Sequence, residues 1–312
     1  MNEALVSADR SAESETGIAR AAPAKINLYL HVTGRRADGY HLLDSLAVFA
    51  GIHDTIVARE NDSLALSLSG PFGAALSASA GGDNLVLRAA KLLREKSGVK
   101  AGASITLVKR LPVASGIGGG SADAAATLLA CDALWKTNAA KPDLAAMALQ
   151  LGADVPICLH GRAAFFGGIG EAIAEAPKLP PAFFVLVNPG IPLSTADVFR
   201  ARRGSFGSPG RFNDAPKDAA GFAQILGTRR NDLSEAAIGL CPVLSQVLEA
   251  LAGAKDCLLS RMSGSGATCF GLFATEAEAK AAAREIGAKQ PRWWVAASAL
   301  IADTRTLDPI LP

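Results

Sequence analysis

Hydrophobic and polar residues alternate along the first stretch that the sequence predicts to be ordered, which begins at about Ala21. Ile26 and Leu28 alternate with Lys25 and Asn27. This period of two is typical of a half-buried β-strand, and it places Lys25 and Asn27 on the same face. The two side chains are therefore expected to lie side by side.

The same reading of the chain predicts further strands, at 41–49, 54–59, 64–68, 104–109, 163–166, 183–187, 257–260, 268–273 and 293–300. Helical spacing and terminal signals predict helices at 84–96, 121–134, 142–152, 194–199, 231–239, 242–252 and 276–286. Strands and helices segregated in this way predict an α+β fold class with two domains. We expect an N-terminal domain at 21–176, a C-terminal domain at 177–312 and a surface loop at 204–215.

The loop between the predicted strand at 104–109 and the helix that is expected to begin at about Ser121 is rich in glycine. Its glycines are Gly116, Gly118, Gly119 and Gly120. They remove side chains and permit positive φ angles, so backbone N–H groups can converge on an anion. The helix N-terminus adds N–H donors and partial positive charge at the same place. This loop is predicted to be a phosphate cradle, although it matches neither the dinucleotide fingerprint nor the Walker pattern.

Several motifs also have a simpler reading. The glycine loop could be a flexible linker, and Asp123 after it could be a helix cap or lie near a metal that bridges phosphates. On spacing alone, Asp154 is better explained as a cap for the next helix than as a catalytic group. A second glycine turn at 263–266 is either a tight hairpin or the other wall of a polyphosphate site.

Composition narrows the function classes. The net charge of +2 gives no general attraction for nucleic acid or anionic lipid. The five cysteines are odd in number and widely spaced, which indicates reduced core thiols of a cytoplasmic protein, and the four histidines lack metal-ligand spacing. The longest apolar run, 182–187, is far too short to span a bilayer.

The first twenty residues carry acidic side chains and no apolar core segment. This pattern argues against a secretory signal and against an organelle transit peptide. We expect residues 1–20 to be a disordered tail.

Three stretches together resemble the motifs of the GHMP small-molecule kinases: Pro-Ala-Lys-Ile-Asn at 23–27, the glycine loop at 112–122, and Ser-Gly-Ser-Gly-Ala at 263–267. The stretches at 34–41 and 151–156 further resemble the members of this superfamily that act on 4-diphosphocytidyl-2-C-methyl-D-erythritol in non-mevalonate isoprenoid biosynthesis. The resemblance implies a ribosomal-protein-like N-terminal domain and a ferredoxin-like C-terminal domain, with the active site in the cleft between them.

The activity implied by the resemblance is transfer of the ATP γ-phosphoryl group, with Mg²⁺, to the 2-hydroxyl of this cytidine diphosphate methylerythritol substrate. The implied catalytic pair is Lys25 and Asp154. The residues implied in ATP binding are Pro112, Val113, Ala114, Ser115, Gly116, Ile117, Gly118, Gly119, Gly120, Ser121, Ala122, Ser263, Gly264, Ser265 and Gly266. The residues implied in acceptor binding are Asn27, which orients the substrate, Tyr40 and Phe199, which sandwich the cytosine, His41 at its polar edge, and Thr195 near the diphosphate.

Two rival readings stay open at this point. One keeps the superfamily and changes the acceptor to homoserine, mevalonate or a sugar. The other is a non-catalytic module that holds RNA, which the near-neutral charge disfavours. The sequence determines neither the Mg²⁺ ligands nor the oligomeric state.

Overall fold

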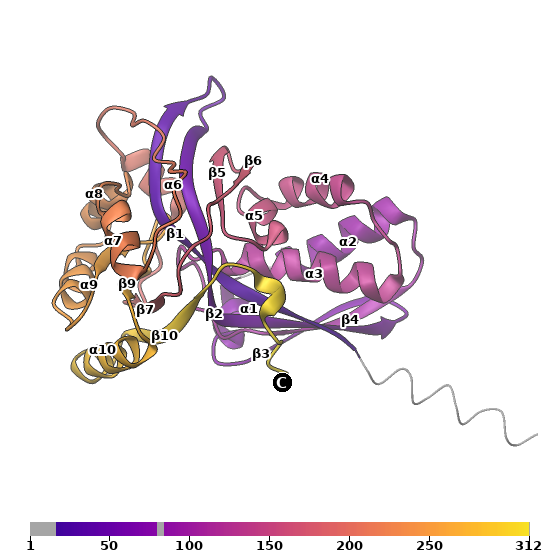
Figure 1. Ribbon diagram of the computed structural model, residues 1–312. Coiled ribbons are helices and arrows are strands. Elements are labelled where there is room, and N and C mark those ends of the chain that lie inside the picture. The colour runs from indigo at the N-terminus through magenta and orange to yellow at the C-terminus, as the bar shows by residue number, and fades with distance from the viewer. Residues whose placement is uncertain (1–16, 80–83, 312) are drawn as a thin grey trace, which may run out of the picture.

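The computed structural model describes residues 17–79 and 84–311, which fold as an α+β protein of two halves (Figure 1). Within these residues one mixed sheet contains the strands β1 (Ile18–Arg35), β2 (His41–Asn61), β3 (Leu64–Ser69), β4 (Gly102–Val108), β5 (Ala164–Gly168), β6 (Ala172–Glu175), β7 (Phe183–Asn188), β8 (Leu259–Met262), β9 (Cys269–Phe273) and β10 (Trp294–Ile301). The helices are α1 (Gly73–Ser79), α2 (Leu85–Ser97), α3 (Gly119–Trp135), α4 (Lys141–Leu151), α5 (Val155–His160), α6 (Thr195–Ala201), α7 (Ala219–Gly227), α8 (Ser234–Leu240), α9 (Val243–Ala252) and α10 (Glu276–Lys289), followed by a short 3-10 turn, η1 (Thr304–Thr306). Across the described ranges, every helix is too short or too polar to cross a membrane.

The long antiparallel hairpin of β1 and β2 joins the two halves. The sheet order is β3-β4-β2-β10-β7-β9-β8, so β2 pairs with β4 of the N-terminal half and with β10 of the C-terminal half. The sequence predicts two separate strands at 41–49 and 54–59, whereas β2 is continuous. It stays extended because β1 pairs along most of its length while the partner on its other edge changes.

Helices cover the sheet differently in the two halves. In Figure 1, α2, α3 and α4 lie together over the N-terminal part of the sheet, and α8, α9 and α10 lie around the C-terminal strands. The predicted boundary lies between β6 and β7. After β10 the chain returns to the N-terminal half, where the Thr304 N–H donates to the Gly161 carbonyl at 2.8 Å.

The first strand departs from its prediction in two ways. It begins at Ile18, which pairs with Ala58, so residues 18–20 belong to the sheet; residues 1–16 of the expected tail lie outside the described residues. It is also buried on both faces from Ala22 to Val32, where a half-buried strand is expected. The polar face is covered because the second glycine turn and the 204–215 loop pack over it.

The starts of two helices, α2 and α3, show how far local sequence signals place the helix ends. Asn84 caps α2, with its side chain accepting from the Val86 N–H at 2.8 Å. The helix after the glycine loop begins at Gly119, so Ser121 lies inside its first turn and the N-cap is Gly118. The positive φ of Gly118 turns the chain into the helix earlier than a serine cap requires. Helices α1 and α7 and strand β6 are not predicted by the sequence analysis.

Candidate active site

A cavity of about 580 Å³ lies where the glycine loop, the β1–β2 hairpin and the start of α6 meet. Its walls come from both halves of the molecule. The expected site residues that line it are Lys25, Asn27, Pro112, Val113, Ala114, Ser115, Gly116, Gly118, Gly119, Gly120, Ser121, Asp154, Thr195, Phe199, Gly264 and Ser265. The expected residues that do not line it are Tyr40, His41, Ile117, Ala122, Ser263 and Gly266.

Lys25 and Asp154 meet on this cavity. The Lys25 ammonium lies 3.0 Å from Asp154 Oδ2 and donates to Asn27 Oδ1 at 2.7 Å. Lys25 is almost fully buried, while the Asp154 side chain is 37% exposed. Asp154 occupies the N-cap position of α5 but its side chain makes no cap hydrogen bond, so the capping interpretation is wrong and the carboxylate is directed to the lysine.

Asn27 is held on three sides. Its Nδ2 donates to Ser45 Oγ at 2.8 Å, and its backbone N–H donates to Ser263 Oγ at 3.1 Å. The prediction that Lys25 and Asn27 share a face is confirmed by their hydrogen bond. Because Ser263 belongs to the second glycine turn, Asn27 links that turn to the lysine.

The glycine loop adopts the conformation that an anion cradle needs. Gly116 and Gly118 have φ angles of 75° and 64°, which is the left-handed region that favours glycine. The first hydrogen bond of the following helix runs from the Ala122 N–H to the Gly118 carbonyl at 2.8 Å. The N–H groups just before Ala122 have no helical partner because they precede the first turn. Donors and the positive end of α3 therefore lie at the cavity.

The two glycine turns are in contact. A Cβ atom built at Gly116 would lie 2.2 Å from the Gly266 carbonyl oxygen, and one built at Gly264 would lie 2.8 Å from the Gly116 carbonyl oxygen. The Thr268 N–H also donates to the Ser115 carbonyl at 3.0 Å. The turn is more than a local hairpin, since it supports the glycine loop of the other half.

Asn231 holds the second turn from behind and was missed by the sequence analysis. Its Nδ2 donates to the carbonyl oxygens of Met262 and Gly264, both at 2.8 Å. Asn231 is buried and precedes α8. Its place at the start of a predicted helix was the sequence signal, and this signal indicates a helix cap. It does not indicate a contact with the second glycine turn.

Of the residues expected around the acceptor nucleotide, Phe199 and Thr195 line the cavity, and His41 is in contact with Phe199. The His41 ring stacks on Phe199 with centroids 5.1 Å apart and an interplanar angle of 25°. Tyr40 is 62% exposed. The Thr195 hydroxyl lies 2.8 Å from the Ser265 hydroxyl. Burial, together with the positive charges of Arg35 and Arg202, lowers the pKa of His41, so its ring is neutral at pH 7.

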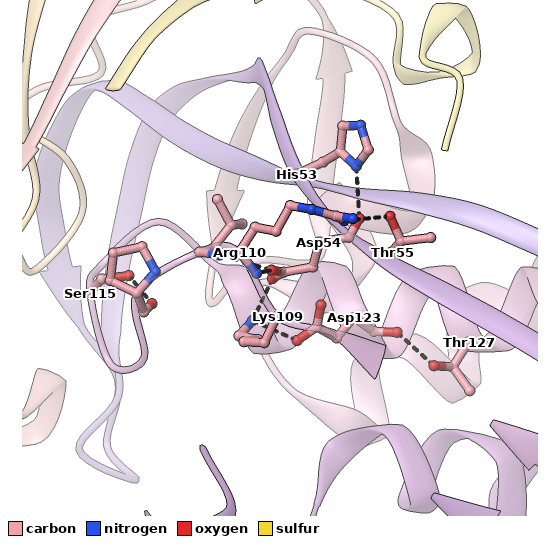
Figure 2. Close-up of polar contacts among 10 residues, drawn as sticks. His53, Asp54, Thr55, Lys109, Arg110, Ser115, Asp123 and Thr127 are labelled. Atoms are coloured by element: carbon pink, nitrogen blue, oxygen red, sulfur yellow. Dashed lines mark hydrogen bonds and ion pairs between the residues drawn. The ribbon is translucent and has the colours of Figure 1, made fainter. Parts of the chain in front are cut away.

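A buried ion cluster lies beneath the glycine loop (Figure 2). The Lys109 ammonium lies 2.7 Å from Asp123 Oδ2 and also contacts Asp54 Oδ2. All three side chains are almost fully buried. Asp123 is therefore not a helix cap, since Gly118 holds that position and the Asp123 side chain pairs with Lys109. In the described ranges no group of three or more His, Cys, Asp and Glu side chains could hold a metal. Lys109 could have been singled out from the sequence, because it is a lone lysine at the end of an apolar strand.

Comparisons with known families match both halves of the chain. The model of the GHMP kinases N terminal domain matches residues 84–162, and that of the GHMP kinases C terminal region matches residues 214–292. The 4-diphosphocytidyl-2-C-methyl-D-erythritol kinase of Paramagnetospirillum magneticum is 53% identical over 280 residues, which cover 90% of this chain and 97% of the relative.

Solved structures agree with these relatives. A crystal structure of 4-(cytidine 5'-diphospho)-2C-methyl-D-erythritol kinase superposes with a TM-score of 0.74 at 38% identity, covering 90% of this chain and 98% of the other. A homoserine kinase from Cytophaga hutchinsonii superposes with a TM-score of 0.69 at 18% identity, covering 92% and 96%, which shows a shared fold alone. From its identity to these relatives and the matches in both halves, the chain belongs to the GHMP kinases and, within them, to the 4-diphosphocytidyl-2-C-methyl-D-erythritol kinase family.

Proposed function

We propose that this kinase transfers the γ-phosphoryl group of ATP to the 2-hydroxyl of 4-diphosphocytidyl-2-C-methyl-D-erythritol. The observation that carries the proposal is the Lys25–Asp154 pair at 3.0 Å on the wall of the cavity that the glycine loop also lines. Family membership supports the acceptor, and the two glycine turns support a polyphosphate donor. We assign the active site to this cavity, between a ribosomal-protein-like N-terminal domain and a ferredoxin-like C-terminal domain.

ATP fits the donor side of the cavity. A side chain at Gly118 would lie 3.1 Å from the Lys25 side chain, so the backbone at this point is open to a ligand only because glycine stands there. The unpaired N–H groups at the start of α3 would bind phosphate oxygens, as helix N-termini do. Residues 112–122 and 263–266 form the proposed ATP site.

Mg²⁺ fits as a companion of the nucleotide. The described residues contain no cluster of His, Cys, Asp or Glu side chains that could hold Mg²⁺ alone. The phosphate oxygens of ATP would therefore supply most of the ligands of the ion, with water completing its coordination shell. When bound, the ion neutralises phosphate charge during transfer.

Lys25 and Asp154 have separate roles in the proposed reaction. The Lys25 ammonium neutralises charge that develops on the transferred group, which is the main demand of phosphoryl transfer. Asp154 accepts a hydrogen bond from the attacking hydroxyl and takes its proton late, since a carboxylate is too weak a base to deprotonate an alcohol first. Asn27 fixes the lysine by accepting one of its hydrogen bonds.

The nucleotide part of the acceptor would bind at the rim. We assign cytosine stacking to Tyr40 and Phe199, the polar edge of the base to His41, and the diphosphate region to Thr195. In the structure the His41 ring covers one face of Phe199. The cytosine would therefore either displace the His41 ring from Phe199 or stack on the face of His41 that points away from Phe199. The neutral His41 can both donate and accept, which suits the edge of cytosine.

We also assign the enzyme to the cytoplasm, with a small-molecule substrate and no nucleic-acid partner. All five cysteines are free, and reduced thiols are typical of that compartment. The net charge of +2 disfavours binding to a polyanion.

The test is ADP release from Mg-ATP by the purified protein, with two acceptors compared. One is 4-diphosphocytidyl-2-C-methyl-D-erythritol and the other is the same polyol phosphate without cytidine. We expect release with the nucleotide-bearing acceptor only. Release with homoserine, mevalonate or a sugar instead would overturn the acceptor assignment, and failure to bind ATP would overturn the kinase assignment.

A further inference from the structure

The buried cluster of Lys109, Asp54 and Asp123 connects the three elements that frame the glycine loop. Asp54 lies on β2, Lys109 directly follows β4, and Asp123 lies in the first turns of α3. Figure 2 shows Lys109 between the two carboxylates, with the Asp123 backbone carbonyl accepting from the Thr127 hydroxyl on the far side. The cluster lies outside the Lys25–Asp154 pair and has no role in the mechanism above.

Both ends of the glycine loop depend on this cluster. The second oxygen of Asp54 accepts from the backbone N–H groups of Arg110 and Leu111, the latter at 2.8 Å, which fixes the residues that enter the loop. At the other end, a Cβ atom built at Gly119 would lie 3.1 Å from the Lys109 ammonium. The start of α3 therefore rests directly on the lysine.

The charges of the cluster do not balance when all three groups are ionised, because two carboxylates share one ammonium. The second carboxylate oxygen of Asp123, Oδ1, is buried and has no hydrogen-bond partner among the described residues. A charged oxygen left in this state costs more than a protonated one. Oδ1 of Asp123, whose lone pairs accept no hydrogen bond, is thus the atom on which a proton is held.

The titration of Asp123 follows from this environment. Burial raises the pKa of Asp123 to about 7, with Lys109 opposing the shift and Asp54 adding to it. Burial alone would lower the pKa of Lys109, but the two carboxylates raise it, so the lysine stays charged. The other ionisable group near Asp123 is the Cys158 thiol on α5, whose pKa burial raises far above neutrality. Lys25, the charged group of β1 across Gly118, keeps its partner Asp154.

We propose that Lys109, Asp54 and Asp123 are positioning residues of the ATP site, and that the proton on Asp123 sets the charge beneath the phosphate cradle. With Asp123 protonated, the cluster is neutral and the positive end of α3 acts on the phosphates without opposition. With Asp123 ionised, a net negative charge lies under the same helix end and weakens phosphate binding. This inference rests on the proposed ATP site.

The test is the dissociation constant of ATP, measured by calorimetry without acceptor at pH 6 and pH 8. From pH 6 to pH 8 we expect ATP binding to the wild type to weaken about three- to tenfold more than binding to Asp123→Asn. Titration of ATP itself is common to both proteins and cancels in the comparison. The exposed residue Asp143 on α4 provides the matched control, and Asp143→Asn should keep the wild-type profile.

The two proposals fail in different ways. If the wild type does not bind ATP at all, the proposed function fails. If it binds ATP and Asp123→Asn keeps the wild-type pH profile, the role of Asp123 is overturned. Should Asp123→Asn fail to fold, Asp123→Ala leaves the Lys109–Asp54 pair balanced and is held to the same criterion.

Discussion

The Lys25 ammonium lies 3.0 Å from the Asp154 carboxylate, although the lysine belongs to β1 and the aspartate to the start of α5. Lys25 is buried and Asp154 is partly open to the cavity. The lysine is therefore held in place, while the carboxylate can reach a bound acceptor. This asymmetry suits a pair in which the carboxylate meets the hydroxyl.

Asp154→Asn should lower kcat by about 10² to 10⁴, the range for loss of one acid–base group. The affinity for ATP should change little, because the proposed partner of Asp154 is the acceptor hydroxyl and not the nucleotide. Steady-state turnover and calorimetric ATP binding check both halves of this expectation. A variant with near wild-type turnover would remove Asp154 from the mechanism.

Gly116→Ala tests the contact between the two glycine turns. The new Cβ would lie 2.2 Å from the Gly266 carbonyl oxygen, so the backbone of one turn must move. A displacement of about 1 Å in a positioning loop can cost on the order of 10²-fold in rate, and we expect a loss of that order in kcat/KM for ATP.

The matched control for this variant is Gly98→Ala. Gly98 also has a positive φ, 72°, but a Cβ there meets nothing within 4 Å. It should lose about 1 kcal/mol of stability from backbone strain and keep normal ATP kinetics. Equal ATP kinetics for the two variants would show that the contact between the turns is unimportant.

Tyr40→Ala should raise KM for the nucleotide-bearing acceptor. Stacking of a base on an aromatic ring contributes about 1–3 kcal/mol, which corresponds to roughly five- to 150-fold in affinity. Tyr40 is 62% exposed, so its removal should leave folding intact. KM measured with and without the cytidine moiety on the acceptor checks the assignment, and an unchanged KM for the cytidine acceptor would refute it.

The contribution of Asp123 to the stability of the enzyme should fall as the pH rises from about 4 to about 7. Burial raises the pKa of Asp123 from 3.8 to about 7 on folding, so between these values the folded state binds more protons than the unfolded state. Stability therefore decreases with rising pH across this window. Urea unfolding of the wild type and Asp123→Asn at several pH values between 4 and 8 measures the difference, and the variant should lack this decrease. A parallel decrease in both proteins would assign it to other groups.

Sequence patterns were enough to predict most of the elements and the family. Period-two alternation placed Lys25 and Asn27 on one face, and the two share a hydrogen bond. The Asn84 cap of α2 is a local contact of the same kind, since it reaches the backbone only two residues away. The left-handed turns at Gly116 and Gly118 could be predicted because they depend on local backbone geometry.

Which distant residues meet depends on the tertiary packing. Asp154 had the local pattern of a cap, yet its side chain pairs with Lys25. The contact of Gly116 with Gly266 and the pairing of Lys109 with Asp54 join segments far apart along the chain. Such contacts depend on how the sheet and helices pack, and no local periodicity records that packing. The chemistry of the site was therefore visible in the residue types, while its geometry was set by the joining of the two halves.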